Sequence, residues 1–300
     1  MTDVTDARGL PELEFDDVES WAENYVLTTS LREKLAPPRV PPRFREGLAL
    51  PLRLAQPGRP EELKPAHRRE RTPKPAALRE PQHRARALHS FFHHELQAAE
   101  LMCWAILAFP DAELEFRKGL LGICLDEIRH MNLYRAHIEQ LGSSIGAFGV
   151  RDWFWYRVPA CETKLAFVSV MGMGLEAANL EHASNFAARF RAAGDETGAV
   201  IQERIAKEEI AHVSFATRWF ARWTGGLKFD DWVSHLPSPL SPWVLRGDPV
   251  AVHLRIRAGM PAEFVAAVAA YVPEPRGLAS RGAPDAPDAP DAPEPDEAAG

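Results

Sequence analysis

Helical periodicity dominates the middle of the chain, between about residues 83 and 223. Apolar residues recur there every three or four positions, with polar residues between them, which is the pattern of amphipathic helices. Proline and glycine punctuate this stretch and divide it into four segments. The pattern therefore predicts four long helices, over residues 83–109, 112–141, 160–192 and 195–223.

Short breaks group these helices into two pairs. Pro110 ends the first helix and Asp111 is the expected N-cap of the second, while Gly194 separates the third from the fourth. Helices joined by short turns run antiparallel, so each pair is predicted to form a helical hairpin. The connection between the pairs, residues 142–159, is long enough to cross from one end of a bundle to the other.

The flanks follow different patterns. One short helix is predicted over residues 15–35, and the eleven prolines of residues 35–82 predict extended chain and short turns. Residues 245–271 predict one or two further short helices. The Ala-Pro-Asp repeat near the end has no apolar residue larger than Ala, so disorder is expected there. The expected domains are an N-terminal extension (1–82), a helical bundle (83–223), a C-terminal helical extension (224–275) and a disordered tail (276–300).

Composition narrows the class of protein. The apolar content of 46% supports a sizeable core, and the net charge of −7 argues weakly against a nucleic-acid partner, although residues 31–90 are rich in arginine. Neither a signal-like start nor an apolar run of membrane-spanning length is found. Isolated cysteines without a C-x-x-C motif favour a reducing compartment. The sequence therefore predicts a cytoplasmic protein without a membrane partner; the three cysteines are Cys103, Cys124 and Cys161.

The motif Glu-x-x-His occurs twice, as Glu127 with His130 and, 82 residues later, as Glu209 with His212. Each pair stands on the apolar stripe of its helix, so both side chains are expected to point inward. Burial of an unpaired carboxylate is strongly unfavourable. For one such pair, a simple ion pair with a neighbouring His or Arg would be a sufficient explanation.

The partner helices repeat a second motif, Glu-x-x-x-x-Glu. The first hairpin has Glu95 and Glu100, and the second has Glu176 and Glu181. Glu95 precedes Glu127 by 32 residues and Glu176 precedes Glu209 by 33, so the hairpins repeat one another. Two similar hairpins can face each other about a pseudo-twofold axis. Four carboxylates would then balance two divalent cations, and carboxylate with imidazole suits iron or manganese.

Helical geometry selects one glutamate of each pair. With the first turn centred near residue 111, Glu95 and Glu127 lie at the same height, whereas Glu100 lies about 7.5 Å nearer the turn at about 1.5 Å per residue. Glu95 is the predicted ligand, and the matched spacing favours Glu176. Glu100 and Glu181 are predicted to act from beside the ligands, as catalytic proton-relay residues, with plain polar contacts in the bundle as the alternative.

This constellation resembles the ferritin-like superfamily of di-iron carboxylate proteins, in which two helices give one Glu each and two give Glu-x-x-His. The segment "HHELQAAELMCWAILAFPDAELEFRKGLLGICLDEIRHMNLY" is most similar to a bacterial branch of unassigned function, and "LRIRAG" (254–259) resembles its C-terminal extension. The resemblance spans about residues 83–223 and implies an all-α, ferritin-like four-helix bundle. The metal ligands that it implies are Glu95, Glu127, His130, Glu176, Glu209 and His212.

The resemblance also implies a class of function. We expect a non-haem di-iron oxidoreductase that uses two iron ions and O2 to hydroxylate or desaturate a small organic substrate, with manganese open at either position. The di-iron tRNA hydroxylases and rubrerythrin are more distantly similar. A ferroxidase, another iron-handling protein or a peroxide reductase is the alternative, although the Cys-rich domain of rubrerythrins has no counterpart here. A homodimer is compatible with the sequence, and the electron donor is not indicated.

Two further groups stand close to the candidate ligands. The histidines beside Glu95 and Glu181 are expected at the surface or next to the ligand carboxylates; they are His89, His93, His94 and His182. An aromatic run in the connection either lines a substrate entrance or covers one end of the bundle; it consists of Trp153, Phe154, Trp155 and Tyr156.

Overall fold

The computed structural model describes residues 14–45, 47, 50–65 and 73–273. Within these ranges the regular structure is helical, and an isolated bridge between Pro65 and Val150 is the only β-type pairing found. The expected all-α class is confirmed. The chain divides into unit 1, Met1–Glu70 with Ala85–Pro159, and unit 2, Arg71–Arg84 with Ala160–Gly300. Residues 83–223, the predicted bundle domain, are divided between the two units. That these residues form one domain stays a prediction.

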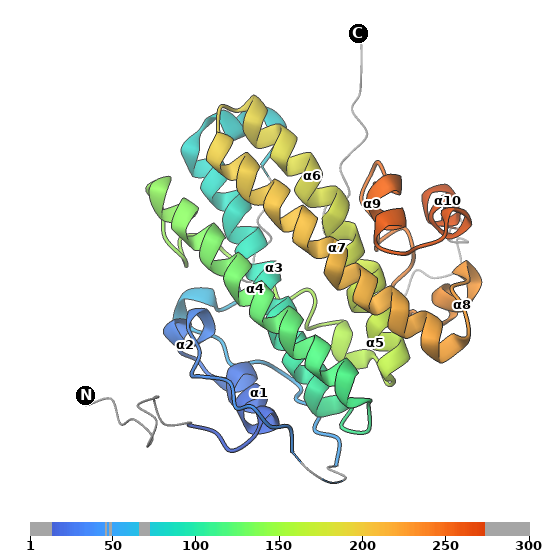
Figure 1. Ribbon diagram of the computed structural model, residues 1–300. Coiled ribbons are helices and arrows are strands. Elements are labelled where there is room, and N and C mark those ends of the chain that lie inside the picture. Colours follow the sequence, from blue (N-terminus) through green and yellow to red (C-terminus); the bar gives the residue numbers. More distant parts are fainter. Residues whose placement is uncertain (1–13, 46, 48–49, 66–72, 274–300) are drawn as a thin grey trace, which may run out of the picture. The chain divides into compact units, whose positions relative to one another are not determined.

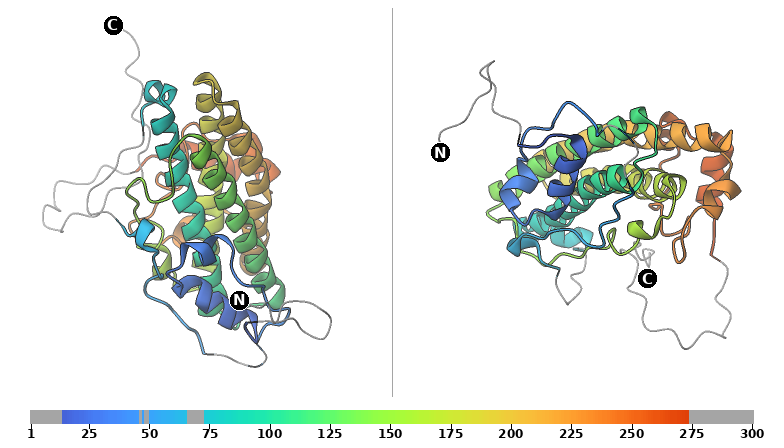
Figure 2. Two further views of the ribbon diagram at one scale, coloured as in Figure 1. Left: turned by 90° about the vertical axis from the view of Figure 1, so that its left-hand side faces the viewer. Right: turned by 90° about the horizontal axis from the view of Figure 1, so that it is seen from below.

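Two long helices form the body of unit 1. Helix α3 (Pro81–Ala108) and helix α4 (Leu114–Gln140) lie side by side, as Figure 1 and both views of Figure 2 show. The two helices run antiparallel. In an antiparallel pair, the residue numbers of contacting residues add up to a nearly constant value, and two contacts show this. Phe91 meets Tyr134 (91 + 134 = 225), and Cys103 meets Cys124 (103 + 124 = 227) with 3.4 Å between the sulfur atoms.

The turn between α3 and α4 corrects one expectation. Asp111 does not cap α4: the N-cap is Glu113, and its side chain makes no capping hydrogen bond. The reason is a tight turn in which the N–H of Ala112 donates to the carbonyl of Phe109, so that Asp111 lies inside the turn. The other end agrees with the prediction, because α4 ends before Gly142, which adopts a positive φ of 77°.

The N-terminal extension contains two short helices where one was expected. Helix α1 (Val18–Leu27) is capped by Asp17, which accepts from the N–H of Ser20, and helix α2 (Leu31–Leu35) is capped by Ser30. Ser30 accepts from the N–H of Glu33, three residues later, and this capping interaction starts a new helix. Where the structure describes it, the proline-rich stretch after α2 is irregular apart from short 3₁₀ turns, η1 (Glu61–Leu63) in unit 1 and η2 (Pro75–Arg79) in unit 2, as predicted.

The extension contributes to the core of unit 1. Trp21 and Tyr25 of α1 are buried and stack with their ring centroids 5.4 Å apart. The buried ammonium of Lys34 in α2 donates to the carbonyls of Tyr25 (2.5 Å) and Val26 (3.0 Å), in the last turn of α1. Each fully buried large apolar side chain stabilises the fold by about 1.5–3 kcal/mol. Helices α1 and α2 of the extension are therefore an integral part of this unit.

Unit 2 contains the second hairpin, with one interruption. The predicted helix over residues 160–192 is helix α5 (Lys164–Val170), a π-helical turn η4 (Met171–Glu176) and helix α6 (Ala177–Ala192). Helix α7 (Glu196–Thr224) lies beside α6 (Figures 1 and 2). Positive φ angles at Gly194 (81°) and Gly225 (78°) bracket α7, as the pattern predicted.

Three short helices complete unit 2: α8 (Phe229–Ser234), α9 (Val252–Arg257) and α10 (Ala262–Ala270). The last two confirm the prediction for residues 245–271, whereas α8 was not predicted. Phe229, Trp232 and Phe264 form an aromatic cluster that packs α8 against α10. The expected disordered tail over 276–300 lies outside the described residues. No helix among the described residues is both long and apolar enough to cross a bilayer.

Candidate metal-binding site

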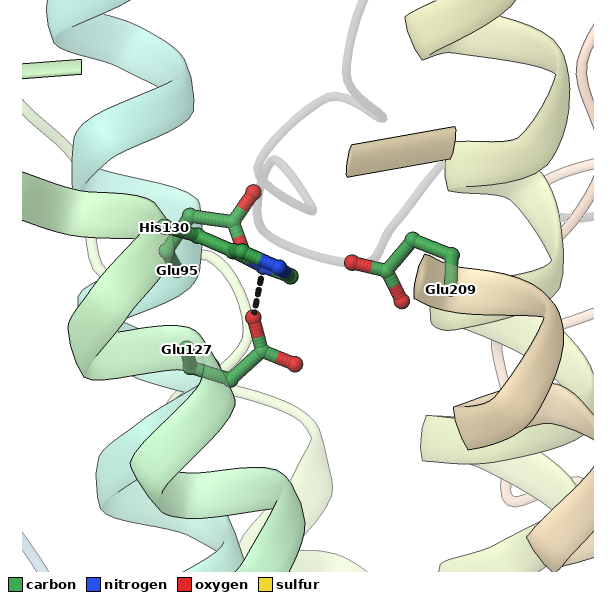
Figure 3. Close-up of side chains that lie close together, drawn as sticks. All are labelled: Glu95, Glu127, His130 and Glu209. Carbon is green, nitrogen blue, oxygen red and sulfur yellow. Dashed lines mark hydrogen bonds and ion pairs between the residues drawn. The ribbon is translucent and has the colours of Figure 1, made fainter. Parts of the chain in front are cut away.

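Unit 1 brings three of the six predicted ligands together. Helix α3 supplies Glu95, and α4 supplies Glu127 and His130; all three are buried, with exposed fractions of 4%, 0% and 0%. His130 Nδ1 lies 3.0 Å from Glu127 Oε2 and 3.6 Å from Glu95 Oε2. Figure 3 draws this cluster and also labels Glu209, which belongs to unit 2. One ligand atom from each of the three lies within 4.8 Å of the others, which is a suitable spacing for ligands of one metal ion.

The electrostatics of the unit 1 cluster favour a bound cation. Burial raises the pKa of Glu95 well above its usual value, and the nearby Glu127 carboxylate raises it further. Burial alone would lower the pKa of His130, but the hydrogen bond to Glu127 and the charges of both glutamates raise it to about 12. Without a metal, the cluster therefore keeps a proton on the imidazole. A divalent cation can take the place of that proton.

Unit 2 brings the other three predicted ligands together. Glu176 ends the π-helical turn η4, and α7 supplies Glu209 and His212; these are also buried, with exposed fractions of 5%, 0% and 3%. His212 Nδ1 lies 3.0 Å from Glu209 Oε2, and one ligand atom from each of the three lies within 4.8 Å of the others. A residue that the sequence did not indicate, Asn179 of α6, donates from Nδ2 to Glu209 Oε1 at 3.3 Å.

The same register produces both clusters. In unit 1 the summed number of Glu95 and His130 is 225, the value that Phe91 and Tyr134 also give, so Glu95 lies opposite His130. In unit 2, Asn179 and Glu209 give 388 (179 + 209), and Glu176 with His212 gives the same sum. Because Glu-x-x-His places both side chains on one face, one turn apart, each histidine meets its own glutamate at 3.0 Å.

Glu100 anchors the N-terminal extension. Its buried carboxylate pairs with Lys34 Nζ of α2 at 2.8 Å and with Arg59, and it accepts from Trp155 Nε1 at 2.8 Å. Burial would raise the pKa of Glu100, but Arg59 and Lys34 lower it below its usual value, so this glutamate stays ionised. These contacts favour an anchoring role, and the predicted catalytic role stays a prediction.

Glu181 anchors the C-terminal extension. It forms a two-pronged ion pair with the fully buried Arg255, at 2.7 Å from Nε and 2.8 Å from Nη2. It also accepts from the backbone N–H groups of Gly247 (2.9 Å) and Ala251 (3.0 Å). A Cβ at Gly247 would lie 2.4 Å from Glu181 Cβ, so only glycine fits there. Arg255 lies in "LRIRAG", which gives that segment a structural purpose; the predicted catalytic role of Glu181 stays a prediction.

The histidines before Glu95 hold the connection between the hairpins. His89 accepts from the N–H of Gly146 at 2.9 Å, and His93 Nε2 lies 2.9 Å from Asp152 Oδ1. Both are buried, so surface placement is wrong for these two, and burial lowers the pKa of each. His94 stacks on Phe154 with 5.2 Å between centroids.

The aromatic run lies on unit 1. Trp153 and Trp155 are buried, whereas Tyr156 is exposed. The backbone of the run is hydrogen-bonded to α3, because Gln97 Oε1 accepts from the N–H of Phe154 at 3.0 Å. An entrance-lining role for this run stays a prediction. His182 of unit 2 is half-buried.

The fold and these clusters define a helical protein with two buried carboxylate–histidine sites. The chain belongs to the family described as "Protein of unknown function (DUF455)", whose model matches residues 19–266. That range includes both clusters and the cations Lys34, Arg59 and Arg255, so the anchors of both extensions lie within the family's extent. Comparisons with curated proteins and with solved structures give no match.

Proposed function

We propose that this protein is a non-haem di-iron oxidoreductase that uses O2 to hydroxylate or desaturate an organic substrate. One observation carries the proposal: each unit buries two glutamates and one histidine whose ligand atoms lie within 4.8 Å of one another. A buried group of this kind without a cation is electrostatically unfavourable. Its occurrence in both hairpins, at equivalent positions, is difficult to explain by packing alone.

The chemistry of the donors fits iron. Two carboxylates and one neutral imidazole carry two negative charges, which one divalent ion balances. Carboxylate and imidazole donors without thiolate suit iron or manganese. The raised pKa values of Glu95 and His130 support the same conclusion, because they arise from a cluster that lacks its positive charge. The residues that would hold the two ions are Glu95, Glu127 and His130 in unit 1, and Glu176, Glu209 and His212 in unit 2.

Bound iron would supply the one-electron chemistry needed to reduce O2, which no protein side chain supplies alone. The chain itself would provide orientation and exclusion of water. Glu127 and Glu209 fix the imidazoles of His130 and His212 through hydrogen bonds of 3.0 Å. All six donors have at most 5% of their surface exposed, so the sites are protected from bulk water.

Anaerobic loading with iron(II), followed by elemental analysis, tests the metal sites. We expect two ions per chain, and a stoichiometry of one or below would contradict the proposal. The sequence repeat also leads us to propose that the two ions share carboxylates. Manganese(II) loading tests it, because two ions that share ligands give a spin-coupled EPR spectrum whereas two separate ions give independent signals.

Exposure of the loaded protein to air then tests the reaction. An oxygenase should react once per pair of ions and convert an added organic substrate. If excess iron(II) under air instead accumulates as hundreds of ferric ions per assembly, the protein stores iron. Rapid turnover of peroxide without oxidation of an organic substrate would favour the peroxide reductase.

A further inference from the structure

Glu176 is the last residue of the π-helical turn η4, between α5 and α6. Such turns are rare and occur mostly as single turns inserted in α-helices. One residue corresponds to about 100° of helix rotation, so a shift of the extra residue from before Glu176 to after it would turn this carboxylate away from His212. The place of the turn along the helix therefore decides whether Glu176 joins the cluster of unit 2.

Trp232 of α8 contacts the backbone just before this turn. Its indole Nε1 donates to the carbonyl of Ser169, which lies 2.9 Å away and two residues before Met171, the first residue of η4. A helix departs from regular α geometry where a side chain inserts into its ladder of backbone hydrogen bonds. A carbonyl oxygen that also accepts from an indole holds its helical partner less tightly, so the bond from Trp232 favours the start of a wider turn at this point.

Both partners of this hydrogen bond are held firmly. Trp232 is fully buried, and its ring centroid lies 5.9 Å from that of Phe229 and 5.5 Å from that of Phe264. Ser169 is also fully buried, and its hydroxyl donates to the carbonyl of Leu165 at 2.8 Å. The geometry of the bond is therefore set by the packing on either side of it.

The turn also packs closely against two apolar side chains. A Cβ at Gly172 would lie 2.1 Å from that of Ala216, and a Cβ at Gly174 would lie 3.0 Å from Leu245 Cδ1. These contacts limit where the backbone can lie, but they do not select a hydrogen-bonding pattern. The bond from Trp232 is directional and can select one.

We propose, on the basis of the function above, that Trp232 is a positioning residue. Its hydrogen bond to Ser169 fixes where the π-helical turn begins and thereby directs Glu176 toward the other donors of its cluster. Helix α8, which the sequence did not predict, thus contributes to metal binding without supplying a ligand.

Amide hydrogen exchange of the full-length, metal-free protein, followed by mass spectrometry, tests whether Trp232 holds the turn. Trp232→Phe keeps a buried aromatic ring and removes the N–H donor. The amides of residues 170–177 should exchange about 2–12-fold faster, as expected for the loss of one hydrogen bond. Trp21→Phe is the matched control, because Trp21 is buried in unit 1 and its Nε1 donates to the carbonyl of Pro38 at 2.8 Å. This control should leave the exchange of residues 170–177 unchanged.

Anaerobic calorimetric titration with manganese(II) tests whether the turn directs Glu176. Trp232→Phe should weaken overall manganese binding about tenfold, the low end of the range for residues that orient ligands. In the Glu176→Ala background the same change should cause no further loss from the binding that remains, because the ligand through which Trp232 acts is gone. An equal loss of affinity in both backgrounds would overturn the inference.

Exchange over residues 170–177 that changes no more in Trp232→Phe than in Trp21→Phe would overturn it as well. If Trp232→Phe does not fold, replacement of Trp232 by 3-benzothienylalanine keeps the shape of the ring with sulfur in place of the N–H, and the same results are expected. A wild type that binds no manganese contradicts the proposed function instead. The exchange measurement needs no metal and still tests the bond from Trp232, so the two failures are distinguishable.

Discussion

In unit 1, Glu95 lies opposite His130 on two uninterrupted α-helices, whereas in unit 2 Glu176 lies opposite His212 at the end of a π-helical turn. A π-helical turn inserts an extra residue into a helix and is found often at functional sites. Despite this difference, each histidine keeps a 3.0 Å contact with the glutamate three residues before it. The buried donors are therefore preserved while the helix that presents one of them changes.

The second glutamate of the Glu-x-x-x-x-Glu motif has different partners in the two units. Glu100 pairs with two cations from the N-terminal extension, Lys34 and Arg59. Glu181 pairs with one cation from the C-terminal extension, Arg255, and adds two backbone N–H groups. The repeated Glu-x-x-x-x-Glu motif thus serves two purposes: its first member faces the cluster, and its second member attaches whichever extension belongs to that unit.

The largest expected effect separates these two purposes. Glu95→Ala and Glu176→Ala should each abolish occupancy of at least one metal position, because each removes a carboxylate donor. Glu100→Ala and Glu181→Ala should leave both positions largely filled, since changes beside a ligand weaken affinity about 10–100-fold without eliminating binding. Elemental analysis after anaerobic loading measures this. If Glu100→Ala removes more metal than Glu95→Ala does, the assignment of Glu95 as the metal ligand from α3 is wrong.

The second effect is on stability. Glu181→Ala leaves the guanidinium of Arg255 buried without a carboxylate, which costs about 3–5 kcal/mol. Glu100→Ala is expected to be as severe, because it leaves Lys34 and Arg59 without their shared partner. Urea unfolding measures both. The control is Arg191→Ala, which removes a solvent-screened, exposed ion pair with Glu196 and should change stability little. Equal costs for the buried and exposed pairs would contradict the anchoring role.

The third prediction concerns pH. Because the pKa of His130 is about 12 in the folded, metal-free protein and about 6.5 when unfolded, the stability from this group is complete below about pH 6.5 and is lost as pH rises toward about 12. A metal ion must displace this proton, so its affinity should rise about tenfold per pH unit for each proton released. Calorimetry in buffers of different ionisation enthalpy counts the protons. Binding without proton release near neutral pH would contradict the assignment of His130.

The smallest effect compares two glycines. A Cβ at Gly172, in the π-helical turn, would lie 2.1 Å from the Cβ of Ala216, so Gly172→Ala should destabilise the protein by about 1–3 kcal/mol. Gly122 of α4 has open space at the same position, and Gly122→Ala should stabilise the helix by about 0.5–1 kcal/mol. Thermal unfolding of the two variants should therefore shift in opposite directions. If Gly172→Ala is as stable as the wild type or more stable, the π-helical turn accommodates a side chain and the prediction is wrong.

The sequence predicted what depends on local periodicity. Three of the four predicted long helices lie within a few residues of their expected bounds, and the third, over residues 160–192, is found as α5, η4 and α6. Apolar residues repeat with the helical period along each of these segments. The inward direction of Glu127 and Glu209 follows from the same stripes. Their cluster partners Glu95 and Glu176 were found because the two hairpins repeat one another.

The missed features mostly depend on distant residues. Arg59 and Glu100 are 41 residues apart, and Arg255 and Glu181 are 74 apart, so no local pattern joins them. The amide of Asn179 became informative only once the register with Glu209 was known. One miss had a local signal: Ser30 and Glu33 form the Ser-x-x-Glu pattern of a capping box, which marks the start of α2.

The order in which the chain visits its two units has a consequence for synthesis. Residues 71–84 belong to unit 2 but are made before most of unit 1, and Arg84 pairs with Asp195 of unit 2, 3.1 Å away and 111 residues later (195 − 84). At about 5–20 residues per second, roughly 6–22 s pass before the ribosome delivers that partner. Unit 1 is fully synthesised at Pro159, so it can fold while residues 71–84, the segment of unit 2 that lies between the two parts of unit 1, still wait for their partners. During this interval the nascent chain holds the complete Glu95–Glu127–His130 cluster, and a metal ion could bind there before the second cluster exists.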